Sequence, residues 1–250
     1  MTDETILIER PDTAVRVIRL HRPEKKNAIT RAMYLAMTDA LAAAEAEDEV
    51  RVIVFLGTPG CFSAGNDMAD FAQMAMSDTL GTEVLGFLRA LATAQKPLVS
   101  GVDGLAIGIG TTLHLHCDLT VVSTRTQLRT PFVDLALVPE AASSLLVPRI
   151  VGHQRAFALL AAGLPIAAEE AVAAGLVWKA VAPEMLEQET FAAAALLAAK
   201  PPQALRIARQ LLRGDSTEIL ARIDIEAEHF AARLKSTEAQ AAFMAFLARR

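Results

Sequence analysis

The sequence predicts an α/β fold made of stacked strand–strand–helix units, followed by a C-terminal region of helices. Three observations predict it. Short apolar runs alternate with helical patterns in the first part of the chain, and nearly everything after residue 141 has a helical pattern. The composition is rich in Ala, Leu and Val and poor in aromatic residues, and 250 residues are enough to bury a full core.

The first half of the chain carries strand and helix patterns in alternation. We expect strands at residues 5–10, 14–20, 50–56 and 97–102, and helices at residues 31–47 and 82–94. A turn at Pro11 and Asp12 joins the first two strands, and Thr30 is the expected N-cap of the first helix. The continuous apolar runs at 50–56 and 97–102 are typical of strands buried on both faces.

The second half of the chain is mainly helical. Residues 104–116 are expected to open with glycines and continue as a helix. We expect strands at residues 119–123 and 176–181, and helices at residues 203–213, 217–233 and 237–249. Pro201 and Pro202 mark the expected hinge between a core of residues 1–199 and a helical region of residues 200–250. Apolar stripes in this last region predict an oligomerisation or lid role.

Composition excludes several classes of function. A net charge of −5 argues against general nucleic-acid binding. No apolar window approaches a membrane span, and the N-terminus lacks the pattern of a signal peptide. Cys61 and Cys117 have no metal-binding or redox spacing, so we expect two reduced thiols in a cytoplasmic protein. The C-terminus carries no peroxisomal address.

One carboxylate stands in an apolar and small-residue segment. Glu140 follows Pro139 and precedes a run rich in Ala and Ser. An apolar wall raises the pKa of a carboxylate by desolvation, toward the value that a general base needs. The alternative is an acid that only stabilises the first turn of a helix.

Two glycine-rich segments precede this acid, at residues 61–71 and 102–113. Each follows a buried strand and opens a helix, where backbone N–H groups lack intrahelical partners and can bind an anion. Two such helix starts that converge would form an oxyanion hole. The alternative for the first segment is an ordinary loop capped by Asp67. The second does not fit the dinucleotide fingerprint, because Gly108-x-Gly110 lacks the third glycine.

His114 and His116 raise the question of a metal site. In a helix, residues two apart point in different directions, and no Cys or acid completes a set of ligands. We therefore expect no metal, and packing or partial exposure for both imidazoles.

These segments together resemble the crotonase (enoyl-CoA hydratase/isomerase) superfamily, from residues 22–28 through 173–177. The resemblance implies a spiral of ββα units with a C-terminal helical region, assembled as a homotrimer or a dimer of trimers. It also implies an acyl-CoA thioester substrate with no separate cofactor, since coenzyme A is part of the substrate. The family's oxyanion hole consists of two backbone N–H groups, which fall at Asn66 and Ile109.

The resemblance, and for Phe71 and Met74 the type of residue, assign the remaining site residues. Those expected along the CoA and the substrate are Lys25, Ala28, Ser63, Ala64, Gly65, Asp67 and Met68. Those expected around the acyl group are Phe71, Met74, Thr112 and Phe132. Methionine suits such a pocket because it adapts to flexible chains, although ordinary core packing is the alternative for the methionines.

The acids decide the reaction, because one fold hosts many activities. Hydratases of the family carry glutamates at the positions of Thr112 and Phe132, and neither residue can titrate. Glu140 stands where hydratases usually have glycine, and this resembles the Δ3,Δ2-enoyl-CoA isomerase branch. That branch more often has glycine after the acid, where this chain has Ala141. We expect an isomerase of 3-enoyl-CoA. The alternatives are hydration, isomerisation of a ring-type CoA thioester, and non-catalytic acyl-CoA binding.

Overall fold

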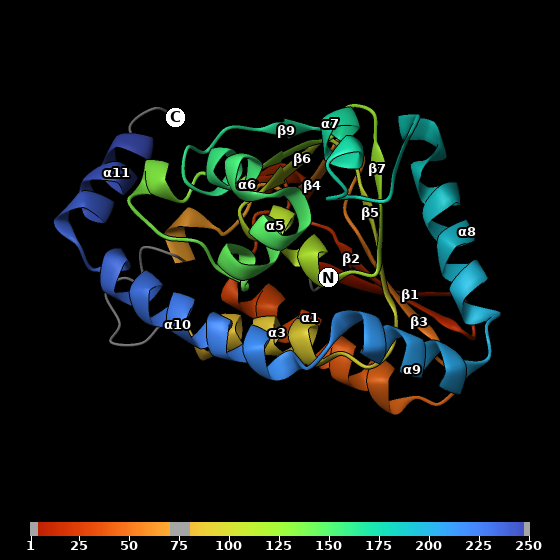
Figure 1. The fold of residues 1–250 in the computed structure, drawn as a ribbon. Coiled ribbons are helices and arrows are strands. Elements are labelled where there is room, and N and C mark those ends of the chain that lie inside the picture. The colour runs from red at the N-terminus through yellow and green to blue at the C-terminus, as the bar shows by residue number, and fades with distance from the viewer. Residues whose placement is uncertain (1–4, 71–80, 248–250) are drawn as a thin grey trace.

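The computed structural model describes residues 5–70 and 81–247, which form two β-sheets with helices around them (Figure 1). The large sheet has the order β1-β2-β3-β5-β7-β10 and is parallel except for the β1–β2 pair. Its strands are β1 (Ile6–Asp12), β2 (Val15–Leu20), β3 (Val52–Leu56), β5 (Leu98–Val102), β7 (Leu119–Ser123) and β10 (Lys179–Val181).

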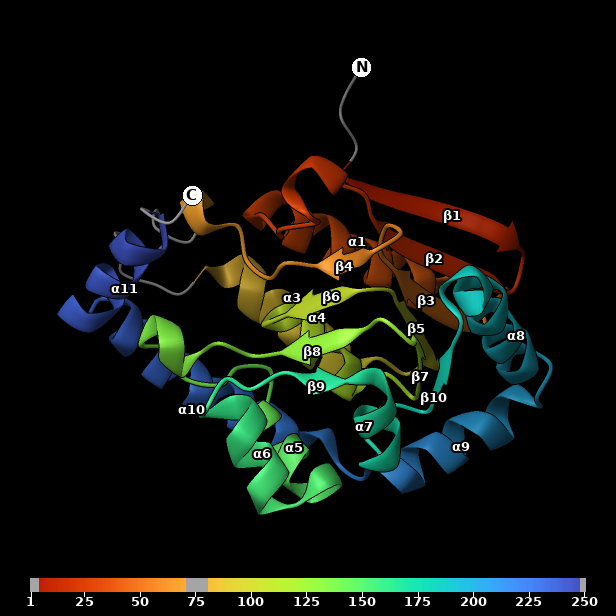
Figure 2. The ribbon, with the colours of Figure 1, turned by 90° about the horizontal axis from the view of Figure 1, so that it is seen from above.

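The small sheet has the order β4-β6-β8-β9. Its strands are β4 (Cys61–Ser63), β6 (Leu105–Ile107), β8 (Gln127–Arg129) and β9 (Ile166–Ala167). Successive strands from β3 to β8 alternate between the large and the small sheet, which is the expected strand–strand–helix repetition (Figure 2). The predicted α/β architecture is therefore confirmed.

Alternate side chains of β3 explain why this strand is apolar throughout. Val52, Val54 and Leu56 pack in one cluster with Ala193 and Ala194 of α8 (Leu186–Ala198). Ile53 and Phe55 point to the opposite face, into the larger cluster that contains the helices α1 (Arg31–Ala46) and α3 (Thr82–Thr93). A parallel strand covered on both faces needs apolar residues at every position.

The remaining helical elements connect the sheets and complete the C-terminal region. The α-helices are α4 (Ile109–Thr112), α5 (Ser143–Val151), α6 (His153–Leu160), α7 (Ala168–Ala173), α9 (Pro202–Arg213), α10 (Ser216–Leu234) and α11 (Thr237–Leu247). The 3₁₀ helices are η1 (Pro23–Lys25), η2 (Leu113–His116), η3 (Val133–Leu135) and η4 (Pro183–Met185). In both views α9, α10 and α11 follow one another along the outside, and α10 packs on α3 (Figures 1 and 2).

Two local predictions need correction. The turn of the first hairpin lies at Thr13 and Ala14 rather than at Pro11 and Asp12, because the Asp12 side chain accepts the N–H groups of Ala14 (2.7 Å) and Val15 (3.0 Å). The segment predicted as a glycine-rich opening and helix begins as strand β6. The N-cap prediction is confirmed, since Thr30 Oγ1 accepts the N–H of Met33 at 3.3 Å. The division near residue 200 stays a prediction.

Within the described residues, none of the helices combines the length and the apolar character needed to cross a membrane.

Candidate active site

The two glycine-rich segments lie side by side because they follow neighbouring parallel strands. β4 pairs with β6, and Ser63 lies opposite Ala106. Gly65 has φ +88°, and a Cβ atom there would lie 3.0 Å from the carbonyl oxygen of Ile107. A Cβ atom on Gly110 would lie 2.9 Å from the carbonyl oxygen of Ser63. Side chains at these two positions would push the segments apart, so the glycines permit the close approach.

Each segment presents a backbone N–H group that has no acceptor among the described residues. Among the described residues, no hydrogen bond is made by the N–H of Asn66 or of Ile109, the first residue of α4. The neighbouring N–H groups are used: Asp67 donates to the Ile29 carbonyl at 2.8 Å, and Gly108 donates to the Arg129 carbonyl at 2.8 Å. The two N–H groups that the family resemblance assigns to the oxyanion hole thus have no acceptor among the described residues.

A cleft of about 790 Å³ opens beside these segments. Glu140, Asn66 and Gly108 lie in its wall. Side chains with positive charge line part of it, namely Arg22, Lys25 and Lys26. Apolar side chains line another part, namely Ile107, Phe132, Leu135, Leu137 and Phe230. This combination suits an elongated ligand with an anionic portion and an apolar portion.

Glu140 is the buried acid of this cleft. The residue is 7% exposed, and its Oε1 atom receives no hydrogen bond from the described residues. Burial, and in second place the charge of Glu226, raise the pKa of Glu140 from 4.5 to about 8. A carboxylate whose pKa lies near neutral pH can both accept and return a proton.

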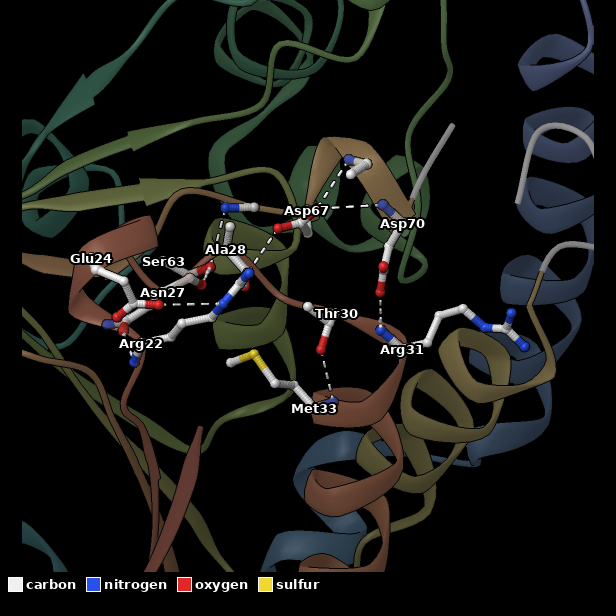
Figure 3. A network of polar contacts seen from close by, with 12 residues as sticks. Arg22, Glu24, Asn27, Ala28, Thr30, Arg31, Met33, Ser63, Asp67 and Asp70 are labelled. Atoms are coloured by element: carbon white, nitrogen blue, oxygen red, sulfur yellow. Dashed lines mark hydrogen bonds and ion pairs between the residues drawn. The ribbon is translucent and has the colours of Figure 1, made fainter. Parts of the chain in front are cut away.

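The other carboxylates in the described part of the cleft wall, Glu24, Asp67 and Asp70, are solvated or engaged. Asp67 accepts a hydrogen bond from Arg22 Nη1 at 2.7 Å, and its other oxygen accepts the N–H groups of Ala69 and Asp70 (Figure 3). Hydrogen bonds and the Arg22 charge lower the pKa of Asp67 against the opposing effect of desolvation. Asp67 therefore caps a helix start and pairs with Arg22, as the capping alternative predicts.

Asn27 fixes the loop that carries the lysines. Its side chain accepts the N–H of Arg22 at 2.7 Å, and its amide group donates to the Cys61 and Phe62 carbonyls at 2.9 and 3.1 Å. The Ser63 hydroxyl donates to the Asn27 carbonyl at 2.8 Å (Figure 3). These bonds tie the loop at residues 22–28 to β4, so the lysines and the first glycine-rich segment keep a fixed relation.

The predicted site residues differ in where the structure places them. Those in the cleft wall are Lys25, Ala28, Ala64, Asn66, Asp67, Met68, Phe132 and Glu140. Ser63, Gly65 and Ile109 shape the segments beside the cleft without lining it. Thr112, expected around the acyl group, is 1% exposed and absent from the cleft wall, and its hydroxyl donates to the Gly108 carbonyl at 3.4 Å. Phe71 and Met74 lie outside the described residues.

The imidazoles of His114 and His116 are both buried. His114 bonds Ser100 Oγ at 3.0 Å and stacks edge-on against Phe62. His116 bonds the Ala141 carbonyl at 2.9 Å. Within the described ranges, no group of three His, Cys, Asp or Glu residues is placed to hold a metal ion.

Sequence reasoning missed two residues beside the site, Tyr34 and Glu226. The Tyr34 hydroxyl donates to Asn66 Oδ1 at 2.5 Å. The Glu226 carboxylate, from α10, accepts hydrogen bonds from the loop that follows Glu140. A signal for Glu226 exists, because it continues the buried spacing of Ile219, Ile223 and Phe230. An acid on the apolar face of a helix is unusual enough to warrant attention.

Comparisons with known proteins agree with this geometry. The family model described as "Enoyl-CoA hydratase/isomerase" matches residues 10–250. The rat (Rattus norvegicus) protein named enoyl-CoA delta isomerase 2 is 35% identical over 239 residues, which are 93% of this chain and 61% of that protein. The chain thus spans less than two thirds of the length of the rat protein. The Escherichia coli K12 protein named 1,2-epoxyphenylacetyl-CoA isomerase is 28% identical over 98% of this chain and 96% of its own length.

Among solved structures, Pseudomonas aeruginosa OdaA has a TM-score of 0.93 and 39% sequence identity, and the match covers 98% of this chain and 99% of that chain. Together with the family match, it confirms the predicted crotonase-like fold.

Proposed function

Because the chain belongs to the enoyl-CoA hydratase/isomerase family, we propose that it shifts the double bond of a 3-enoyl-CoA thioester to the 2 position. The observation that carries the proposal is Glu140, the one buried and unpaired carboxylate in the described cleft wall. A double-bond shift needs a single base that removes a proton and returns it. Hydration needs a group that activates water and a group that protonates carbon, and the two family positions for those acids hold Thr112 and Phe132.

The proposed reaction uses one proton and consumes nothing else. The Glu140 carboxylate removes a proton from C2, and the electron pair of that C–H bond spreads through the C3=C4 bond and onto the thioester oxygen. The N–H groups of Asn66 and Ile109 donate hydrogen bonds to this oxygen as its negative charge grows. Glu140 then returns the proton to C4, the C2=C3 double bond forms, and the carboxylate is ionised again.

The cleft wall supports the same substrate class. Arg22, Lys25 and Lys26 offer positive charge to the phosphate groups of a CoA moiety, although Arg22 already pairs with Asp67. Phe132 and Leu137 offer an apolar wall to an acyl group. The chemistry needs no cofactor and no metal beyond the CoA that is part of the substrate.

The rate of formation of 2-enoyl-CoA from 3-enoyl-CoA tests the proposal, because conjugation of the double bond with the thioester changes its ultraviolet absorbance. We expect turnover by the wild-type protein. Binding of 3-enoyl-CoA without turnover would instead support the non-catalytic acyl-CoA-binding alternative.

A second candidate is isomerisation of a ring-type CoA thioester. The similarity to an E. coli protein whose name specifies such a substrate favours it, since that match covers nearly the whole of both chains. The same base and oxyanion donors would serve. A comparison of kcat/KM for linear 3-enoyl-CoA and ring-type thioesters separates the two candidates.

We also propose that the protein assembles as a trimer or a dimer of trimers. Large apolar side chains on α9 are exposed in the single chain, with Leu211 at 79%, Leu212 at 88% and Ile207 at 50% exposure. Exposed apolar groups of this size on one helix favour a contact with another copy of the chain.

A further inference from the structure

The backbone after Glu140 adopts an unusual conformation for its residues. Ala141 and Ala142 have φ values of +60° and +57°, in the left-handed region. An L-residue with a Cβ atom enters this region only when its surroundings hold it there. The direction in which Glu140 leaves the chain depends on this turn, so the groups that hold the turn also place the Glu140 carboxylate.

Glu226 holds the turn from α10. Its carboxylate accepts hydrogen bonds from the N–H of Ala142 at 2.6 Å, from the N–H of Ser144 at 2.9 Å and from the Ser144 hydroxyl at 2.5 Å. Ala142 is the N-cap residue of α5 and has no side chain that can cap the helix. The Glu226 carboxylate, 5% exposed, therefore replaces an N-cap side chain from a different part of the chain.

His116, which precedes the turn in the sequence, also holds it. Its Nε2 atom lies 2.9 Å from the Ala141 carbonyl oxygen, and because that oxygen only accepts, Nε2 carries the proton. Burial lowers the pKa of His116 to about 4, so its imidazole is neutral at physiological pH. His116 ends η2, which continues directly from α4, the helix that begins with Ile109. The short segment formed by α4 and η2 thus carries the N–H group of Ile109 and, through His116, a contact to the loop that follows Glu140.

We propose that Glu226 and His116 are positioning residues, which hold the two left-handed alanines and thereby fix the Glu140 carboxylate in the cleft. This inference rests on the proposed function, in which Glu140 moves the proton. The assignment is geometric, since His116 and Glu226 bind the carbonyl and the N–H of the peptide group that joins Ala141 and Ala142, and neither residue lines the cleft. Ala141 follows the base directly, where glycine would need no support from its neighbours.

The titratable and charged groups around this pair come from α10, α1 and α9. Glu226 carries negative charge because it accepts three hydrogen bonds, although burial raises its own pKa. Arg222 lies near it on α10 and donates to Ser144 Oγ at 3.4 Å. Burial, and in second place the charge of Glu140, raise the pKa of Tyr34 of α1. The charge of Arg213, from α9, acts on His116 and opposes protonation of its imidazole.

Glu226→Gln tests the proposal. Glutamine keeps one acceptor oxygen, but its NH₂ group would face an N–H donor, so the turn loses part of its support. A displacement of about 1 Å at a reacting group can lower a rate by about 10²-fold. We expect kcat to fall by about 10- to 100-fold with KM for the thioester changed less than about threefold. The acidic limb of the pH profile of kcat/KM should also move to lower pH, because the negative charge beside Glu140 is lost.

His116→Phe is the companion variant, since it removes the hydrogen bond to Ala141 without removing a charge at neutral pH. We expect a lower kcat with the acidic limb in its wild-type position. If the acidic limb of the pH profile moved as far in His116→Phe as in Glu226→Gln, the shift in Glu226→Gln could not be assigned to the loss of the Glu226 charge.

A rescue experiment separates positioning from a merely structural role. Glycine adopts the left-handed conformation without strain, so Ala141→Gly with Ala142→Gly in the Glu226→Gln background should recover at least about tenfold of the lost kcat. The shifted pH limb should persist, because the charge is still absent. The matched control is Ala136→Gly in the same background, which relieves a left-handed alanine with φ +56° outside the turn and should recover nothing.

A second readout keeps this inference distinct from the proposed function. Infrared difference spectra between the wild type and Glu140→Gln report the protonated carboxyl group of Glu140 without any substrate. If the wild type does not isomerise 3-enoyl-CoA, the proposed function fails, and the infrared titration still shows whether Glu226→Gln lowers the pH at which Glu140 ionises. A folded Glu226→Gln protein with a wild-type kcat and unmoved titration overturns the inference. A glycine pair that restores no activity overturns the positioning role.

Discussion

Replacement of Glu140 by glutamine should make the protein less active and, above about pH 5, more stable relative to the wild type. Glutamine keeps the shape of the side chain but cannot accept the C2 proton. A positioned acid or base contributes about 10²- to 10⁴-fold to a rate, so we expect turnover to fall by at least about 10²-fold. The gain in stability follows from burial of an ionisable group that glutamine does not have.

The magnitude follows from the pKa of Glu140 in the two states. The folded protein holds this pKa at about 8, against 4.5 as the ordinary value that we take for the unfolded chain. The folded state therefore binds the proton more tightly, and the contribution to stability is complete below about pH 4.5 and is lost as the pH rises through about 8. Between these values the wild type loses about 1.4 kcal/mol per pH unit from this group, or roughly 5 kcal/mol in all.

The assay compares the free energy of unfolding of the wild type and Glu140→Gln between pH 5 and pH 9. Groups far from Glu140 titrate alike in both proteins, so the difference between them reports Glu140 together with its coupling to Glu226 and Tyr34. We expect the difference to grow in favour of the variant with a slope of about 1.4 kcal/mol per pH unit and to level off above about pH 8. For a chain of this size, each kcal/mol corresponds to about 2–4 °C in Tm.

A difference that does not change with pH would refute the reasoning about burial, because Glu140 would then have the same pKa in both states. Near-normal isomerisation by Glu140→Gln would refute its role as the base. Both results can be read from one protein preparation, with CoA affinity and circular dichroism as controls for folding.

Three further predictions concern the reaction, the oxyanion hole and the assembly. The wild type should add little or no water to crotonyl-CoA, because Thr112 and Phe132 occupy the two acid positions, and a hydration rate equal to isomerisation would contradict this. Asn66→Ala should retain substantial activity because the backbone N–H remains, whereas Ile109→Pro should abolish activity because proline removes the donor. Circular dichroism and CoA affinity must show that both proteins are folded. A fully active Ile109→Pro protein would place the second donor elsewhere. Light scattering at micromolar concentration should give a trimer or a multiple of three, and a monomer would reject the assembly.

Long elements of the fold could be predicted because their patterns are strong. The all-apolar run that contains β3 and the helical spacing of Met33, Met37 and Leu41 in α1 each repeat often enough to identify the element. The small sheet could not be predicted in the same way, since β4 and β6 have only three residues each. A strand of three residues is too short to show the alternation of apolar and polar side chains. Its pairing also depends on contacts with residues far away in the sequence.

The candidate site divides along a similar line. Glu140 and the two glycine-rich segments carry local signals, and the structure brings them to one cleft. The left-handed conformation of Ala141 and Ala142 has no signal in the sequence, because alanine gives no preference for it. The turn's own hydrogen bond, from the Ser143 N–H to the Glu140 carbonyl at 3.0 Å, and the partners 25 residues before and 84 residues after it together hold this conformation.

Two buried carboxylates that face each other would normally destabilise a fold, because each opposes the ionisation of the other. The structure resolves the conflict by giving the two acids different partners. Glu226 accepts three hydrogen bonds from the turn and can keep its charge, while Glu140 has a buried oxygen that no described residue reaches and so favours the protonated form. The charge that holds the turn thus also raises the proton affinity of the base. If Glu226 were neutral, both the position and the basicity of Glu140 would change, and this is why one substitution at residue 226 should affect kcat and the pH profile together.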